Sequence, residues 1–325
     1  MNNELLNILN STVANATPLV IAAIGETLNE RAGVVNLSLD GSLTLAAMTG
    51  FVVGVTTGNA GLGFLAAAII GALVALLIIV ADIQLKQDQI AVGFVLTLLL
   101  ADIAQFLGQE YAGTPSSPLS PIRIPGAADI PIVGPIFFNH SIIVYFSYVL
   151  MIVTWLVMFH SRPGLAQRAV GERPETAFAR GTRVNRQRLF YTVLGGLLIG
   201  IAGASYSLAI KPGWANPPAM RGDGWIALAI VIFGGWHPFR VALGAYLFAL
   251  LRALSSAIQR SPDIQIPLVL LNMLPWLLMI GTLILVSSGV IDRLLRVLPR
   301  PAQRWSRNFL RSDPPAALGT RFDPD

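Results

Sequence analysis

The 325-residue chain is 54% hydrophobic and only 12% charged, and its mean hydropathy is positive. This composition excludes an ordinary water-soluble domain and predicts an integral membrane protein. The net charge of +5 does not argue for a nucleic-acid partner, because arginines collect in the cytoplasmic loops of membrane proteins. The absence of cysteine excludes disulfides, thiolate metal sites and cysteine nucleophiles.

Long apolar blocks follow one another along most of the chain, and the first residues lack the basic region and cleavage site of a signal peptide. The blocks are too long for barrel strands and show no alternation of period two, so they predict helices. We expect an all-α polytopic membrane protein with about eight to ten transmembrane helices. The candidate helices are 12–28, 42–57, 61–81, 90–107, 141–159, 189–210, 225–234, 241–258 and 268–288.

The candidate helix 225–234 is too short for a full crossing. Ten residues rise only about 15 Å, whereas the hydrocarbon core is about 30 Å thick. The sequence therefore predicts a broken or re-entrant helix near 225–239, with its final turn close to the cytoplasmic side.

Arginine counting gives the orientation. The loop 160–188 holds seven arginines, and the residues from 289 onward hold seven more. Both are therefore placed in the cytoplasm, which makes 108–140 a proline-rich outer loop and puts the amino terminus outside. We expect a transmembrane domain over 1–292, followed by a basic, disordered cytoplasmic tail over 293–325.

Charged residues inside apolar segments are the best functional lead, because an intramembrane charge normally faces the interior of the bundle. Glu26 and Asp102 lie within predicted helices, and the stretch between the first two helices adds Glu30, Arg31 and further polar residues. Two interpretations remain open: a translocation pathway or a structural polar network. The members of this set are Glu26, Glu30, Arg31, Asn36, Asp40, Asp102 and Trp225.

The motifs of soluble enzymes are missing from the sequence. The three histidines are far apart, no metal-ligand spacing is present, and there is no nucleophile elbow or phosphate-binding loop. We therefore expect no enzymatic activity, no metal and no cofactor, and any use of ATP requires a separate subunit.

The cytoplasmic loop contains a short helix signal. A proline at 174 precedes good helix formers, and a glycine follows at 181. Such a cationic, capped helix suits a docking element; alternatively, its arginines only follow the positive-inside rule or contact anionic lipid. The candidate docking residues are Gly171, Glu172, Arg173, Pro174, Glu175, Arg180 and Gly181.

Four stretches in order resemble the permease subunits of bacterial ABC importers, in the branch that serves simple sugars, nucleosides and branched-chain amino acids. They are ATPLVIAAIGETLNERAGVVNLSLDG, DQIAVGFVLTLLL, RAVGERPETAFARGTRVNRQR and GDGWIALAIVIFGGWHPFRVALGAYLF. Two positions depart from the family pattern: Asp40 stands where glutamate is usual, and Arg173 where asparagine is usual.

The resemblance implies a multi-pass subunit of the bacterial inner membrane that works by alternating access. Its implied partners are a cytoplasmic ATP-binding subunit that contacts the docking loop, a second permease subunit, and an extracytoplasmic solute-binding protein. The opening motif is closest to the nucleoside type. Tyr206, Trp214 and Trp225 are candidates for stacking on a base; alternatively, they only occupy the membrane interface, where tryptophan and tyrosine are common. Simple sugars are the alternative solute, and a stand-alone secondary transporter or a membrane-embedded enzyme are alternatives of another class.

The resemblance also changes the expectation for residues 28–41. A plain loop would explain their charges, but the motif indicates an ordered, partly buried interruption between two helices. We expect Asp40 to cap the second helix and the charges of the interruption to pair internally.

Overall fold

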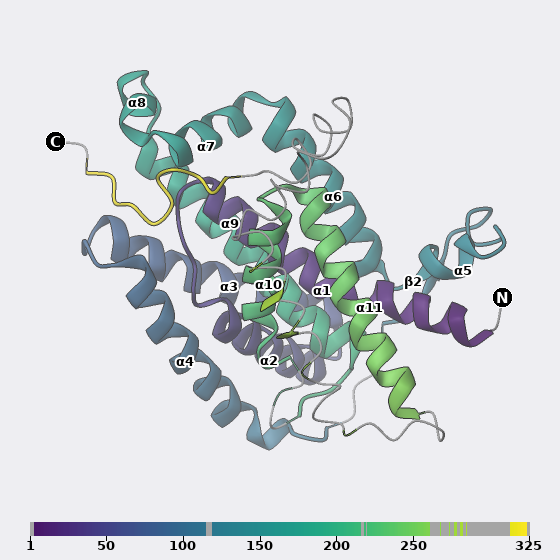
Figure 1. Cartoon of the computed structure of the whole chain (residues 1–325). Coiled ribbons are helices and arrows are strands. Elements are labelled where there is room, and N and C mark those ends of the chain that lie inside the picture. Colours follow the sequence, from purple (N-terminus) through teal and green to yellow (C-terminus); the bar gives the residue numbers. More distant parts are fainter. Residues whose placement is uncertain are drawn as a thin grey trace, which may run out of the picture.

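The computed structural model describes residues 3–114, 119–215, 218, 220–260, 267, 273, 276–277, 280–281, 284 and 313–323. Its described part is almost entirely helical (Figure 1). The helices are α1 (Asn3–Arg31), α2 (Leu39–Thr57), α3 (Ala60–Ile83), α4 (Gln89–Gly108), α5 (Val133–Phe137), α6 (Ile142–His160), α7 (Arg162–Glu172), α8 (Pro174–Ala179), α9 (Val184–Ser205), α10 (Asp223–Gly234) and α11 (Pro238–Arg260). A 3₁₀ turn (Gln109–Tyr111) follows α4, and a π-helical turn, η2 (Tyr206–Ile210), follows α9.

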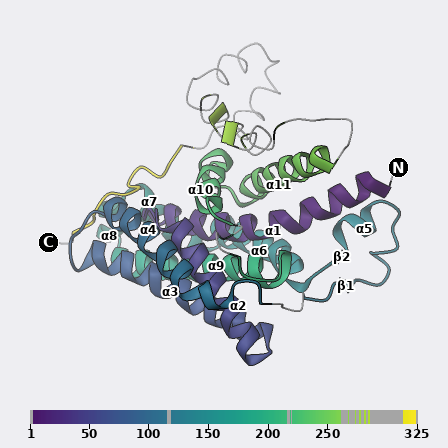
Figure 2. The ribbon, with the colours of Figure 1, turned by 90° about the horizontal axis from the view of Figure 1, so that it is seen from below.

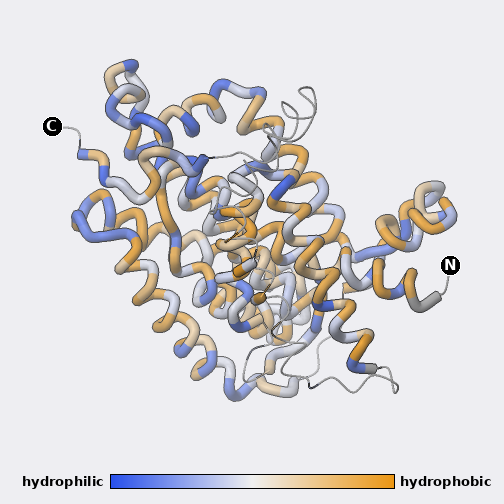
Figure 3. The backbone as a smooth tube through the Cα atoms, viewed as in Figure 1, coloured by the Kyte–Doolittle hydropathy of each residue, from blue (hydrophilic) through white to orange (hydrophobic). Residues whose placement is uncertain are grey.

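Among the described residues, seven helices are long and apolar enough to cross a membrane, which confirms the predicted all-α polytopic class. They are α1, α2, α3, α4, α6, α9 and α11. The span of α4 includes the 3₁₀ turn that follows it, and the span of α9 includes η2. Figure 3 shows these helices mainly in hydrophobic colours, while hydrophilic residues gather at α8 and at the turn between α3 and α4. The predicted span 268–288 falls mostly outside the described residues.

The short helix predicted near 225–239 is α10. Its 12 residues rise about 18 Å, so it cannot cross a hydrocarbon core of about 30 Å. Glycines in the left-handed region bound it on both sides, Gly222 with φ 90° and Gly235 with φ 57°. It reaches the bundle interior as a half-helix, and the chain turns back into α11 directly after it.

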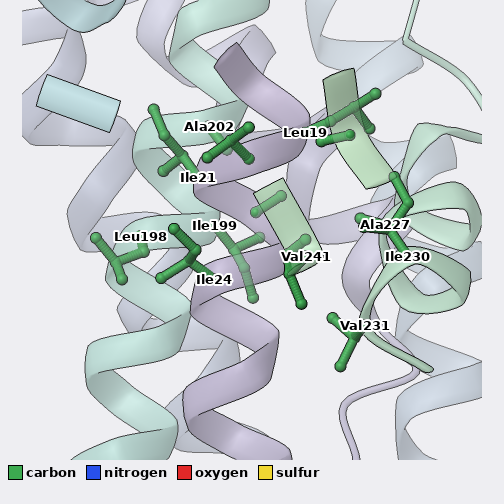
Figure 4. Close-up of a cluster of buried hydrophobic side chains, with 14 of the residues drawn as sticks. Leu19, Ile21, Ile24, Leu198, Ile199, Ala202, Ala227, Ile230, Val231 and Val241 are labelled. Atoms are coloured by element: carbon green, nitrogen blue, oxygen red, sulfur yellow. The ribbon is translucent and has the colours of Figure 1, made fainter. Parts of the chain in front are cut away.

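Helix α1 lies at the centre of the core, packed against α9, α10 and α11 (Figures 1 and 4). Figure 4 shows apolar side chains of the four helices meeting in one cluster, whose members are almost fully buried. Leu19 and Ile24 come from α1, Ile199 from α9, Ile230 from α10 and Val241 from α11. This packing fixes the position of the short helix α10 against α1.

Helices α3 and α9 cross at very close range because both carry glycine at the crossing point. A methyl group added at Gly71 would lie 2.8 Å from the Cα of Gly200. Small residues allow such close backbone contact between membrane helices. The resulting van der Waals packing stabilises the helix pair, because lipid provides no hydrophobic driving force for association.

The two ends of the bundle differ. At one end the outer loop forms a two-stranded sheet, β1 (Ile122–Arg123) with β2 (Asn139–His140), and the side chain of Asn10 in α1 donates to the carbonyl of Pro135 at 2.7 Å. At the other end, α7 and α8 lie beside the residues between α1 and α2 (Figures 1 and 2). The amino-terminal end of α1 and the loop that carries α7 and α8 thus lie at opposite ends of the bundle.

The predicted tail 293–325 is described only over residues 313–323. Those residues lie against the docking loop, where Ala317 N–H donates to Gly171 O at 2.9 Å.

Candidate functional site

The interruption between α1 and α2, residues 32–38, is ordered and largely buried, as the sequence indicates. Glu26 is fully buried on α1 and binds this segment through Asn36. One of its carboxylate oxygens accepts from Asn36 N–H at 3.1 Å, and the other accepts from the side chain of Asn29 in α1 at 2.8 Å. The Glu26 carboxylate therefore links the interruption to α1 through hydrogen bonds.

The start of α2 differs from the prediction. Its N-cap residue is Ser38, not Asp40. Asn36 shapes this turn, because its side-chain oxygen accepts from the backbone N–H of Ser38 at 3.0 Å and from the Ser38 hydroxyl at 2.6 Å. Asp40 already belongs to the first turn of α2, and its carboxylate is directed away from the N–H groups of its own helix.

Asp40 instead caps α10. One carboxylate oxygen accepts hydrogen bonds from Gly222 N–H at 2.9 Å and from Gly224 N–H at 3.0 Å. These groups are among the first N–H donors of α10, which have no partner within the helix. A carboxylate there also interacts favourably with the positive end of the helix dipole.

Glu30 and Arg31 bind the opposite end of α10. The indole N–H of Trp236 donates to the carboxylate of Glu30. Arg31 donates to the carbonyls of Trp236 at 3.2 Å and Gly235 at 3.3 Å. Together with Asp40, the residues around the interruption therefore fasten both ends of the short helix.

A cavity of about 950 Å³ lies beside the first residues of α10, toward the end of the bundle that carries the outer loop. Its wall comes from α1, η2, the connection between η2 and α10, and α11. Polar residues are frequent in the wall: Ser11, Asn15, Thr114, Tyr206, Lys211, Arg221, Asp223, Arg252, Ser255, Ser256 and Gln259.

A partly buried ion pair lies in the cavity wall. Arg252 of α11 binds Asp223 through both of its terminal nitrogens, one of them at 2.8 Å. The side chain of Asp223 is 1% exposed and that of Arg252 is 38% exposed, so the arginine presents one side to the cavity. Bidentate pairs of this kind fix orientation as well as charge. The pair is not among the site residues predicted from the sequence, although an arginine within the predicted helix 241–258 is itself a signal of an inward-facing site.

Two predicted polar or aromatic residues lie elsewhere. Asp102 is exposed on α4, on a surface with many exposed apolar side chains, so it does not face the interior of this chain. Trp225 does not line the cavity; its ring centroid lies 6.4 Å from that of Phe94 on α4. Tyr206 and Trp214 do line it. The indole of Trp214 is buried against Gly108, which makes it part of the wall.

The docking loop contains the predicted short helix, α8, which ends before Gly181 with φ 86°. Glu172, Arg173, Glu175, Arg180 and Gly181 are exposed, whereas Gly171 and Pro174 are buried. The exposed side chains form a charged surface available to a partner.

The loop is fastened to the inner end of α1. The side chain of Gln167 donates to Leu28 O at 2.8 Å, and Gly171 packs so closely on Arg31 O that a methyl group has no room there. Contacts therefore run from the docking loop through α1 to the turn after α10, and through α10 to the ion pair in the cavity wall.

Within the described residues, no group of three or more histidine, aspartate or glutamate side chains is placed to hold a metal ion. The polar groups of the site serve hydrogen bonding and charge pairing.

Residues 8–284 match the family described as branched-chain amino acid transport system / permease component. The chain is 39% identical over 252 residues to a putative glucose ABC transporter permease protein of Haloferax volcanii, covering 76% of each chain. It is 35% identical to a nucleoside ABC transporter permease protein of Lactococcus lactis, covering 89% of this chain and 96% of the relative. It is 32% identical to a guanosine ABC transporter permease protein of Bacillus subtilis, covering 88% and 92%. No solved structure matches. The chain therefore belongs to the permease-component family of branched-chain amino acid transport systems.

Proposed function

We propose that this multi-pass membrane protein is the transmembrane subunit of an ATP-driven importer and that it forms the translocation pathway for a nucleoside. The observation that carries the proposal is the continuous set of contacts that joins an exposed charged loop at one end of the bundle to a polar cavity at the other. A transporter needs a solute site and an energy input at opposite sides of the membrane, and the chain provides a surface for each.

The solute site is the cavity beside α10. Its volume of about 950 Å³ lies in the range of ligand pockets, about 300–1,000 Å³. Hydroxyl, amide and guanidinium groups in the wall suit an uncharged solute with many hydrogen-bonding groups, and Tyr206 offers an aromatic face for stacking on a base.

The nucleoside assignment rests on two relatives whose names state nucleosides or guanosine and which this chain matches over most of its length. A simple sugar is the second candidate, because the relative named as a putative glucose permease has the higher identity, although over less of the chain.

The energy input is an ATP-binding subunit docked on α7 and α8. Glu172, Glu175 and Arg180 supply exposed charges for that contact. Displacement of the loop would reach α1 through Gln167 and Gly171, and then α10 through Glu30 and Arg31. Because α10 carries Asp223, a shift of this half-helix changes the cavity wall and alternates access.

Two further partners complete the proposed assembly. A second permease subunit covers the exposed apolar face of α4, where Phe94, Leu98 and Phe106 are exposed around Asp102. An extracytoplasmic solute-binding protein delivers the solute on the side of the outer loop 108–140.

The test is transport in proteoliposomes by the complex of this chain with its ATP-binding and solute-binding subunits, purified by their association with it. We expect ATP-dependent uptake of labelled guanosine or another nucleoside, reduced by excess unlabelled nucleoside and not by glucose. Competition by glucose alone would favour the sugar permease. Uptake by this chain without an ATP-binding subunit would refute the proposal in favour of a secondary transporter.

Gly171 and Glu172 provide a test of the docking loop. Gly171→Ala should abolish stimulation of ATP hydrolysis by solute, because the added methyl group overlaps Arg31 O, and Glu172→Ala should weaken it. The control is Gly244→Ala, where the nearest atom to the new methyl group is a side-chain atom of Ile230 at 3.2 Å. Unchanged stimulation in both docking variants would contradict docking through this loop.

A further inference from the structure

Residues 313–323, hereafter the strap, have the sequence DPPAALGTRFD and belong to the basic tail that follows the last predicted helix. The strap is an irregular segment that runs beside α7 and α8 (yellow in Figures 1 and 2). Its contacts join four segments that are far apart in the sequence.

The first contact is with the docking loop. Ala317 N–H donates to Gly171 O at 2.9 Å, and Ala316 N–H donates to the carboxylate of Glu172 at 3.3 Å. The strap therefore binds the last turn of α7, immediately before the docking helix α8.

The second contact is with the interruption between α1 and α2. Gly319 N–H donates to Gly33 O at 3.0 Å. Both glycines have positive φ, 70° for Gly319 and 87° for Gly33, which residues with a Cβ adopt only at a cost. The close backbone pairing of two such glycines is a specific fit between the strap and the interruption.

The third contact is with the inner end of α9. Arg188, which is 1% exposed, donates to Thr320 O at 2.8 Å. A buried guanidinium needs acceptors, and the strap supplies one of them from its backbone.

The fourth set of contacts covers the docking helix and reaches the turn after α3. Phe322 is 8% exposed and packs with Val170, Ala177 and Val184, and its ring centroid lies 5.5 Å from that of Phe178. Lys86 forms an ion pair with Asp323 at 2.7 Å. Of the six residues of α8, only Pro174 and Ala177 are buried, and Phe322 covers Ala177.

We propose that the strap is a positioning element for energy coupling, which holds the docking loop on the inner ends of α1, α3 and α9 so that they move as one body. This inference rests on the proposed function, since it requires an ATP-binding subunit that acts on α7 and α8. Without the strap, α8 would keep its exposed charges but lose its apolar cover, and its displacement would no longer reach the interruption.

The first experiment compares two stop codons in the complete transporter, one after Ser312 and one after Asp323. The shorter chain lacks the strap, and the longer one keeps it. We expect the chain ending at Asp323 to transport normally. We expect the chain ending at Ser312 to insert and to hydrolyse ATP with its partner at the basal rate, but to lose solute-stimulated hydrolysis and at least tenfold of its ATP-dependent uptake.

Equal coupling in the two truncated chains would overturn the inference. Failure of the full-length complex to show ATP-dependent uptake would instead refute the proposed function, so the two failures are distinguishable.

Should removal of the strap prevent insertion, Phe322→Ala in the full chain provides the test. We expect this variant to move about fivefold less solute per ATP hydrolysed, or still less. Phe322→Leu should restore most of the coupling. Pro314→Ala, at an exposed position of the strap, should have no effect, and full coupling in Phe322→Ala would again overturn the inference.

The second experiment asks whether the strap stays in place during transport. The chain has no cysteine, so Lys86→Cys with Asp323→Cys introduces a single pair for a short bis-maleimide. We expect efficient cross-linking in the double variant, none within either single variant, and full transport after cross-linking, because the strap and the α3–α4 turn move together. Loss of transport on cross-linking would show that the strap must leave, and would overturn the positioning role.

Discussion

Asp40 caps a helix that begins at Asp223, because its carboxylate accepts from the backbone N–H of Gly224 at 3.0 Å across 184 positions of sequence. A methyl group at Gly224 would lie within van der Waals overlap of the Asp40 backbone, so α2 and the start of α10 are in direct contact. The polar residues that flank the interruption between α1 and α2 thus hold both ends of the half-helix beside the cavity.

Replacement of Asp40 by alanine should lower both stability and uptake. The loss of an N-cap acceptor costs about 1–2 kcal/mol, and here the uncapped end lies beside the cavity wall. We expect a lower thermal unfolding midpoint in detergent and a strong loss of uptake, while Asp40→Asn, which retains an acceptor oxygen, should lose less of both.

Asp88→Ala is the matched control for Asp40. Asp88 caps its own helix α4 by accepting from Ala91 N–H at 2.9 Å, at an exposed position away from the cavity. Its removal should cost stability of similar size without loss of uptake. Equal losses of uptake in the two variants would contradict a special role of the cap on α10.

The ion pair between Asp223 and Arg252 predicts a large effect of breaking it from one side. Arg252→Ala leaves the carboxylate of Asp223, 1% exposed, without its charged partner. Because Arg252 itself is 38% exposed, the cost should lie below that of breaking a fully buried pair, about 3–5 kcal/mol, and above that of breaking an exposed pair. Arg252→Lys keeps the charge but loses the bidentate geometry, so its effect should be intermediate between those of the wild-type protein and Arg252→Ala. The quantities to measure are the unfolding midpoint and the concentration of solute that gives half-maximal uptake.

Arg123 provides the comparison for that pair. It binds Asp129 at 2.6 Å in the outer loop, with both side chains more than half exposed. Exposed pairs contribute about 0–1 kcal/mol, so Arg123→Ala should leave the unfolding midpoint nearly unchanged. A loss as large as that of Arg252→Ala would mean that burial does not decide the energy of these pairs.

Much of the fold could be predicted from the sequence, because lipid forces the backbone of each apolar block to satisfy itself as a helix. The half-helix α10 and the short docking helix α8 also follow from local signals, length in one case and proline and glycine in the other. Helix α1 begins at Asn3 rather than at residue 12, because its polar first turns pack beside the outer loop through Asn10.

The partners of the polar residues could not be predicted. Nothing in the local sequence distinguishes an aspartate that caps its own helix from one that caps a distant helix. The sequence therefore predicts that Asp40 caps α2, which is wrong. Glu26 and Asp102 look alike in sequence, yet Glu26 is fully buried and accepts from a backbone N–H and a side-chain amide, whereas Asp102 is exposed on α4. Only the three-dimensional arrangement separates them.

The crossing of α3 and α9 predicts that Gly200 does not tolerate a side chain. A methyl group there would lie 2.8 Å from the Cα of Ala68, within the backbone of the facing helix. Forcing the helices apart should cost about 1–3 kcal/mol, so Gly200→Ala should lower the unfolding midpoint. The control is Gly244→Ala, where the added methyl group meets only the side chain of Ile230 and the unfolding midpoint should change little. Equal unfolding midpoints for the two variants would contradict the close crossing.

The pH dependence of stability should contain a contribution from His237, in the turn between α10 and α11. Burial, and then the charges of Arg240 and Arg31, lower the pKa of His237 from 6.5 to about 4. As pH falls below about 6.5, the unfolded chain takes up a proton that the folded chain does not bind until about pH 4, so the free energy of unfolding decreases across that interval. The unfolding midpoint in detergent should therefore fall more steeply from pH 7 to pH 4.5 in the wild-type protein than in His237→Gln. Because all other titrating groups are common to both proteins, parallel curves would show that His237 takes up its proton equally in the folded and unfolded states.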